Sequence, residues 1–269
     1  MNEANWPLSI TEHIFLNANR QTKVFLANLE NKTLPCFPGA DGYADTTAAT
    51  NAVTGFQYTG ANFFILKDHA KRNNYPTAEY LSEEQIEVIR KDKPSIAVKH
   101  GEEGISIFFT NNESSGGGEK WEAKYERLFN VSQTNQPWEI KAWVNDKKQE
   151  QIDFYKKEYG VNIPDAKKKP GPVIHCTSTD PVKFLGEFFA AKELNGKFEV
   201  SPEQEAQFAF KAETLLSTKM DNGHINPFTL SKICNEASLY SKEVIQEIKT
   251  EAIRKERAFN MEQSRGRSR

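Results

Sequence analysis

Cysteine and long apolar runs are scarce in this chain of 269 residues. Its three cysteines, Cys36, Cys176 and Cys234, are odd in number and far apart, which favours a reducing compartment over a disulfide framework. No apolar run approaches the roughly 20 residues that span a bilayer, and no charged-then-apolar leader is recognisable. We therefore expect a cytoplasmic protein that does not contact a membrane.

An excess of either charge is also missing. The chain carries 35 Lys and Arg residues against 37 Asp and Glu residues, which gives a formal net charge of -2. Nucleic acid can therefore be bound only through a local patch of cations, and not by bulk attraction. The apolar fraction of 38% is enough for a true core, and the length fits one large domain or two ordinary ones.

Catalytic and metal-binding strings are the third absence. The five histidines are never three or four residues apart, so no single helix face presents two of them to a metal ion as in a His-Glu-x-x-His site. The pairs His175-Cys176 and His224 with Cys234 are better interpreted as isolated polar or partly buried side chains than as ligands. No glycine cluster has the spacing of a phosphate loop followed by Lys-Ser or Lys-Thr. The sequence therefore predicts no catalytic residue, no metal and no cofactor.

What the sequence does contain is a dense polar loop, Asn51-Ala-Val-Thr-Gly-Phe-Gln-Tyr-Thr-Gly-Ala-Asn62, directly before the apolar block 63–66. Gly55 and Gly60 permit positive φ or close backbone approach, and the polar side chains between them supply donors and acceptors. Such a loop can meet an extended ligand. Taken alone, it is equally typical of a polar turn that caps a buried element.

Two further segments follow in a fixed order, Val98-Lys-His-Gly-Glu-Glu-Gly-Ile-Ser-Ile-Phe-Phe109 and Tyr125-Glu-Arg-Leu-Phe-Asn-Val-Ser-Gln-Thr134. Together the three segments resemble the N-terminal single-stranded-DNA-binding domain of ArdC-type antirestriction proteins, which is also found in plasmid conjugative primases. The first and third segments match the family pattern closely. The second departs from it because His100 lies between Lys99 and Gly101. The resemblance spans about residues 10–137.

The resemblance implies a plasmid- or mobile-element-encoded protein that binds single-stranded DNA without sequence preference. Its role would be to protect or escort an incoming strand, in antirestriction or conjugation. In this interpretation cations neutralise phosphates, aromatic rings stack on bases, and glycines let the backbone approach. The predicted DNA-binding residues are Thr54, Gly55, Phe56, Tyr58, Gly60, Asn62, Lys67, Lys71, Arg72, Lys99, Trp121 and Arg127.

The family's enzymatic parts have no counterpart in this sequence. ArdC-type proteins couple the DNA-binding domain to a zincin-like metallopeptidase domain bearing His-Glu-x-x-His, a string that this chain lacks. The segment Asp41-Gly-Tyr-Ala-Asp45 resembles the metal motif of conjugative primases, but no paired-aspartate motif follows it. We therefore expect a binding protein and not an enzyme. Two alternatives stay open: a diverged primase-type or nuclease enzyme, and a protein-interaction module without DNA binding.

Hydrophobic periodicity predicts an α+β fold, with a small N-terminal α+β domain over residues 1–137 that contains a short antiparallel sheet. Ser82 and Gln85 have the spacing of a capping box at a helix start. The predicted helices span residues 9–30, with a break near Asn17–Asn19, 61–73 and 82–91. The predicted strands span residues 96–98, 105–109 and 128–131, and residues 101–104 join the first two as a hairpin.

The sequence changes character after residue 137. Residues 138–172 are rich in lysine, carboxylates and aromatic side chains, which favours a helical connector; stacking rings beside phosphate-binding cations are the alternative. Residues 173–269 predict a mainly helical domain with a basic tail, whose helices begin near Pro181, Pro202 and Pro227. We interpret the apolar stripes of these helices as core. We expect this domain to recruit a replication, primase or transfer protein.

Overall fold

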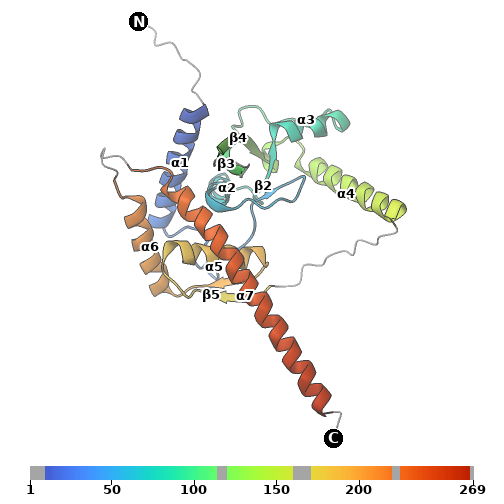
Figure 1. The fold of residues 1–269 in the computed structure, drawn as a ribbon. Coiled ribbons are helices and arrows are strands. Elements are labelled where there is room, and N and C mark those ends of the chain that lie inside the picture. Colours follow the sequence, from blue (N-terminus) through green and yellow to red (C-terminus); the bar gives the residue numbers. More distant parts are fainter. Residues whose placement is uncertain (1–9, 114–119, 160–170, 220–224, 267–269) are drawn as a thin grey trace.

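The structure is a computed structural model that describes residues 10–113, 120–159, 171–219 and 225–266. The described residues form a mixed α+β fold of seven α-helices, a four-stranded sheet and a two-stranded sheet (Figure 1). The helices are α1 (Ile10–Glu30), α2 (Gly60–Arg72), α3 (Glu83–Asp92), α4 (Pro137–Tyr159), α5 (Pro181–Glu193), α6 (Pro202–Leu216) and α7 (Thr229–Gly266). The strands are β1 (Thr50–Asn51), β2 (Glu79–Ser82), β3 (Ile105–Glu113), β4 (Lys120–Asn130), β5 (Val173–His175) and β6 (Lys197–Glu199).

The four-stranded sheet, in the order β1-β2-β4-β3, separates two layers of helices. Neighbouring residues of a strand point to opposite faces, so Tyr80 and Leu81 of β2 enter different hydrophobic cores. On one face Ile105 and Leu128 are buried in the core that also contains residues of α1 and α2. On the other face Leu81 and Phe129 pack with residues of α3 and α4.

The sheet is mixed and not purely antiparallel as predicted. β1 pairs with β2 in parallel, while the β2–β4 and β3–β4 pairs are antiparallel. β3 forms its hairpin with β4, so residues 101–104 do not close the predicted one. The short strand β2 escaped prediction because only four residues of it are extended before α3 begins.

The strand predicted at residues 96–98 is also wrong. Ile96 is buried in the second core, and Val98 makes an isolated bridge to Thr134. The backbone N–H of Ala97 donates to Asn135 Oδ1 at 3.0 Å, and its carbonyl accepts from the Asn135 N–H at 3.0 Å. A side-chain amide therefore takes the place that a neighbouring strand would occupy.

Helix starts are where the sequence was most informative. Ser82 and Gln85 form the predicted capping box, and Ser201 begins α6 with a capping box of its own. Asp180 caps α5 through the N–H groups of Val182 and Lys183, with Pro181 as the first helical residue. The break predicted within the first helix is absent, because α1 runs continuously through Asn17–Asn19.

One large hydrophobic core joins the two halves of the chain. Its buried residues extend from Phe25 in α1 to Ile245 in α7. The ring centroids of Phe63 and Phe188 lie 5.7 Å apart, which brings α2 and α5 into direct contact. In the same core Phe208 of α6 stacks on a ring of α5 at 4.0 Å. The predicted domain boundaries at residues 137 and 172 stay predictions, since this shared core marks no division between the parts.

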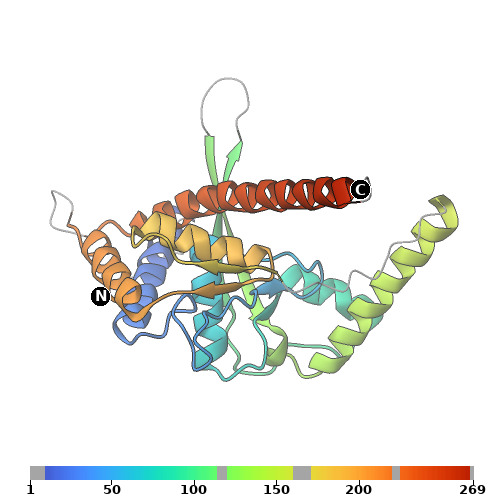
Figure 2. The same ribbon diagram turned by 90° about the horizontal axis from the view of Figure 1, so that it is seen from below.

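The C-terminal part combines its helices with a small parallel sheet. β5 and β6 pair in parallel, which the mainly helical prediction did not include. α7 packs along α5, and its second half projects beyond that helix in both views (Figure 2). Residues 251–258 of α7 are accordingly exposed. Among the helices of the described segments, none has the length and apolarity that crossing a bilayer requires.

Because the core is shared, Phe208→Ala should loosen both halves of the chain together. Removing a fully buried phenyl ring lowers the free energy of unfolding by about 3–5 kcal/mol. Hydrogen exchange of the α2 amides should accelerate along with that of α6, because both belong to one cooperative core. Phe210→Ala, on the exposed side of α6, is the matched control and should change stability by less than about 0.5 kcal/mol. Unchanged exchange in α2 would show that the halves unfold separately.

Candidate nucleic-acid interface

The polar loop after β1 is a tight turn that is built around the Asn51 side chain. Asn51 Oδ1 accepts hydrogen bonds from the N–H groups of Val53 at 3.1 Å and Thr54 at 3.0 Å. The Asn51 amide also pairs reciprocally with the Gln85 amide of α3, at 2.9 and 3.0 Å. Gly55 takes a φ of +71°, which is the left-handed conformation that favours glycine, and its N–H donates to Asn51 O at 2.9 Å. The turn is therefore fixed by hydrogen bonds within it and by the amide pair with α3.

Phe56 is presented outward by this turn. Its N–H donates to Thr54 Oγ1 at 3.2 Å and its carbonyl accepts from the Asn51 N–H at 2.8 Å. The side chain is nevertheless 57% exposed, and Thr54 and Gly55 beside it are exposed as well. An aromatic ring on a rigid, exposed turn can stack on a base at little cost in ordering.

Tyr58 does not have the stacking role that the sequence predicted for it. The side chain is only 2% exposed, packs edge-on against Phe56, and belongs to the main core. Its hydroxyl lies 3.4 Å from Asn51 Nδ2, and burial raises the pKa of the phenol to about 12. A base cannot reach this ring in the folded protein, so Tyr58 stabilises the turn by packing on its buried side.

Gly60 and Asn62 also serve the fold. Gly60 is buried and begins α2 with a φ of +62°. Asn62 Nδ2 donates to the Phe108 carbonyl of β3 at 2.8 Å, while its Oδ1 accepts from Gln21 Nε2 of α1 at 3.0 Å. This amide therefore joins α2 to the sheet and to α1. Tyr58, Gly60 and Asn62, which belong to the loop motif that suggested ligand binding, therefore stabilise the core instead.

Lys192 holds the turn from the opposite half of the chain, and the sequence analysis missed it. It is 3% exposed, and its Nζ donates to Gln57 Oε1 and to the Tyr58 carbonyl, each at 3.3 Å. The ammonium also lies 5.3 Å from the centroid of the Phe63 ring. Burial lowers the pKa of Lys192 from its ordinary value of 10.5 to about 8. The sequence signal that could have identified Lys192 is its position directly after an apolar stretch of α5.

A cleft of about 940 Å³ lies between the loop 33–50 and the second half of α2, and it contains two of the predicted cations. Lys67 Nζ is 2.6 Å from Asp45 Oδ2 and 2.7 Å from Thr47 Oγ1, so its charge is already paired. Lys71 is exposed at the cleft, and within the described part of the chain its side chain has no hydrogen bond or ion pair. Two of the predicted cations therefore line the cleft, together with Lys32 and Lys197, and of the predicted two Lys71 is the better placed to meet a phosphate.

The remaining predicted residues are spread over other elements. Arg72 is bound to the Asp68 carboxylate of its own helix, with Nε at 2.6 Å from Oδ2. Lys99 Nζ donates to the Ser132 carbonyl at 2.8 Å. Arg127 of β4 lies 3.6 Å from the Glu83 carboxylate. Trp121 also lies in β4, but its side chain falls outside the described part of the structure.

The cations and rings predicted from the sequence thus do not gather in one groove: Phe56 lies on the turn, Lys67 and Lys71 line the cleft beside α2, and Arg72, Lys99 and Arg127 have other partners. Carboxylates accompany most of the cations, as Asp45 does Lys67. Burial alone would raise the pKa of Asp45, but hydrogen bonds from Lys67 and Thr47 outweigh it and lower that pKa. The local potential of the cleft is therefore mixed in sign.

The family of the protein is shown by its sequence. Residues 17–161 match the N-terminal domain of anti-restriction factor ArdC. This match covers more than half of the chain, and the protein belongs to that family. A comparison with curated proteins gave no match.

The fold is similar to that of a solved family member, the antirestriction protein ArdC of plasmid R388. Its Mn(II)-bound crystal structure matches with a TM-score of 0.50 at 12% identity, covering 86% of this chain and 97% of ArdC. The metal-free crystal structure matches with a TM-score of 0.47 at 13% identity, covering 86% and 96%. At such identity the likeness concerns the fold alone. In the described residues of the present chain no three His, Cys, Asp or Glu side chains gather in a way that could hold a metal ion.

The buried Lys192 predicts a specific pH dependence of stability. Between pH 8 and 10.5 the folded protein has released the Lys192 proton while the unfolded chain still binds it. The contribution of this group to the free energy of unfolding therefore rises with pH across that window. Urea unfolding at pH 7.5 and 9.5 should show this rise as a difference between the parent chain and Lys192→Met, which loses it; the three buried cysteines, whose pKa values burial raises, oppose it equally in both. Lys183→Met, on the exposed side of the same helix, should keep it.

Proposed function

We propose that the protein binds single-stranded DNA, without sequence preference, through the front half of the chain. The observation that carries the proposal is the exposed Phe56 ring on a turn that is fixed by hydrogen bonds. Membership of the ArdC N-terminal domain family supports it, because the sequence resemblance associates this domain with single strands. Stacking is tolerant of sequence, since every base offers an aromatic face.

The charge distribution supports a binding mode in which stacking outweighs phosphate contacts. Asp45 pairs with Lys67 and Asp68 with Arg72, so these two cations have less attraction left for a phosphate. Lys71 is the cation that we expect to meet the backbone directly. Each stacked base contributes about 1–3 kcal/mol, so a few stacking contacts are sufficient without a strongly basic groove.

In the cell, we propose that the protein protects or escorts an incoming single strand and acts as a binding protein rather than an enzyme. Recruitment of a replication, primase or transfer protein by the C-terminal helices is part of the same proposal. An assay of the protein with an oligonucleotide, magnesium and nucleotides tests whether it is a binding protein rather than an enzyme. Formation of any cleaved or extended oligonucleotide would replace this proposal by a primase-type or nuclease activity.

Phe56→Ala should weaken the binding of a labelled oligonucleotide about tenfold or more, because it removes one stacking platform. Fluorescence anisotropy at two salt concentrations measures the loss, and the salt dependence should stay the same because no charge has changed. Phe210→Ala removes a ring from α6 that is even more exposed than Phe56 and serves as the control, with affinity equal to the parent. Equal losses in the two variants would mean that the turn 54–56 is not the contact.

Lys71→Ala should change the salt dependence of binding. Removing one phosphate contact lowers the slope of log K against log salt by about 0.7 for a single strand. Lys242→Ala removes an exposed lysine from α7 and should leave the slope unchanged. Anisotropy titrations at four salt concentrations give the slopes, and an unchanged slope for Lys71→Ala would exclude the cleft beside α2.

A further inference from the structure

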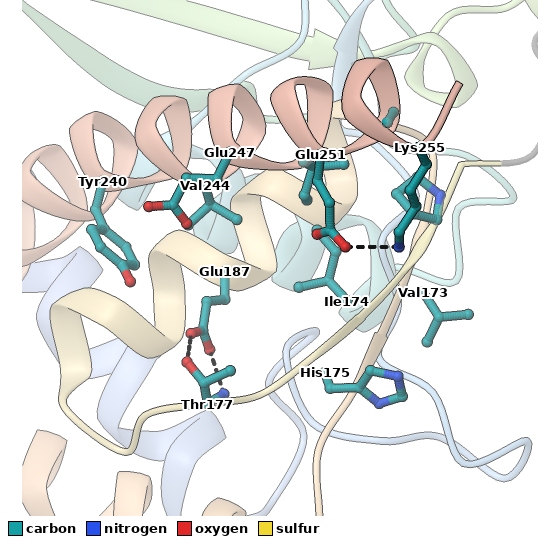
Figure 3. A pocket seen from close by; sticks show the side chains of 13 residues that line it. Val173, Ile174, His175, Thr177, Glu187, Tyr240, Val244, Glu247, Glu251 and Lys255 are labelled. Carbon is teal, nitrogen blue, oxygen red and sulfur yellow. Dashed lines mark hydrogen bonds and ion pairs between the residues drawn. The ribbon is translucent and has the colours of Figure 1, made fainter. Parts of the chain in front are cut away.

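A second pocket lies in the C-terminal part, between α5, α7 and β5 (Figure 3). Its volume is about 450 Å³, in the range of sites that hold a few side chains of a ligand. Apolar residues of β5 and α7 line it, and polar groups from three elements converge on it. The lining residues that matter here are Val173, Ile174, His175, Thr177, Glu187, Tyr240, Val244, Glu247, Ile248 and Glu251.

β5 offers an open strand edge to this pocket. The Pro172 carbonyl accepts from Lys197 N–H at 3.0 Å, and Cys176 N–H donates to the Glu199 carbonyl at 2.8 Å, so alternate residues bond to β6. The backbone groups of Val173 and His175 therefore point the other way. β5 has no second neighbouring strand in the described part of the chain. The three consecutive residues of β5 all line the pocket, although neighbouring side chains of a strand point to opposite faces. The pocket is therefore bordered by the edge of β5 and not by one of its faces.

The start of β5 is packed closely against the segment that leads into β6. A Cβ on Gly171 would lie 2.0 Å from the Leu194 carbonyl oxygen, and one on Gly196 would lie 2.1 Å from the Pro172 carbonyl oxygen. The two backbones are thus packed so closely that only glycine fits. A preformed edge loses little freedom on binding, which favours affinity.

Carboxylates predominate in the pocket: Glu187, Glu247 and Glu251 line it against one lysine, Lys255, whose Nζ lies 2.7 Å from Glu251 Oε1. Glu187 is 3% exposed and accepts hydrogen bonds from the Thr177 N–H at 2.9 Å and from the Thr177 hydroxyl (Figure 3). A carboxylate has about four acceptor positions, so Glu187 keeps acceptor capacity for a ligand. Glu247 adds a second carboxylate from α7. Burial, followed by the charges of Glu187 and Glu247, raises the pKa of Tyr240 in the same pocket.

We propose that this pocket binds an extended polypeptide segment that pairs with the free edge of β5 and directs a lysine or arginine side chain to Glu187. Main-chain pairing to an open edge gives affinity, and the pocket beside it selects the side chain. The carboxylates favour a basic residue and repel phosphate, so the ligand is a polypeptide and not nucleic acid. The proposal is independent of DNA binding, because it rests on another part of the chain.

The test uses the full chain, no DNA, and a fluorescein-labelled peptide of four Val-Lys repeats. This peptide should bind in an anisotropy titration. The same peptide with N-methylated backbone at alternate residues, which cannot pair with a strand, should bind at least about tenfold more weakly, as should a peptide of Val-Glu repeats. Failure of the Val-Lys peptide to bind, or equal binding of all three peptides, overturns the proposal. Loss of DNA binding in the tests above would leave these results unaffected.

Glu187→Gln should weaken binding of the Val-Lys peptide about tenfold, because a charge-assisted hydrogen bond becomes a neutral one. Glu236→Gln, a half-exposed glutamate of α7 outside the pocket lining, is the matched control and should bind like the parent. Hydrogen exchange on the parent chain keeps the test valid if Glu187→Gln fails to fold. The amides of Val173 and His175 should gain protection on adding the Val-Lys peptide, and protection confined to other segments would contradict the proposal.

Discussion

The aromatic contact between α2 and α5 is the interaction on which the rest of the structure depends. Phe63 and Phe64 of α2 face Phe188 and Phe189 of α5, with centroid distances of 5.7 Å for Phe63–Phe188 and 5.9 Å for Phe64–Phe189. α2 follows the polar turn directly, and α5 packs along α7. Each half of the chain thus contributes rings that the other half shields from water. The hydrophobic effect makes the two halves one core, although the family match ends at residue 161.

The position of the exposed turn follows from this contact. Because Phe188 and Phe189 are directed into the core, Lys192 one turn later on α5 is buried too. A buried ammonium must find oxygen acceptors, and the Gln57 side chain and Tyr58 carbonyl supply them. The turn is therefore held by α5 from within, while Phe56 points outward. A surface for stacking is positioned by the helix that also forms one wall of the second pocket.

The sequence predicted what depends on near neighbours and missed what depends on distant ones. The pairing of Ser82 with Gln85 and the helix start at Pro181 are set within three residues, and both are present. The amide pair of Asn51 with Gln85 spans 34 residues, and no local pattern indicates it. The burial of Tyr58 is likewise not indicated by any local pattern, because it depends on the core to which α5 contributes. The loop motif that matched the family was therefore interpreted as a ligand-binding surface, although much of it stabilises the fold.

The two proposed binding surfaces differ in charge. The front half offers an exposed ring and a cleft whose carboxylates partly offset its lysines, and this combination suits a ligand that is held mainly by stacking. The pocket between α5 and α7 places Glu187 and Glu247 beside an open strand edge. A phosphodiester strand is repelled there, whereas a basic polypeptide is attracted. The ligands proposed for the two surfaces carry opposite charge, so they do not compete, which is consistent with our proposal that the protein brings a single strand to a partner.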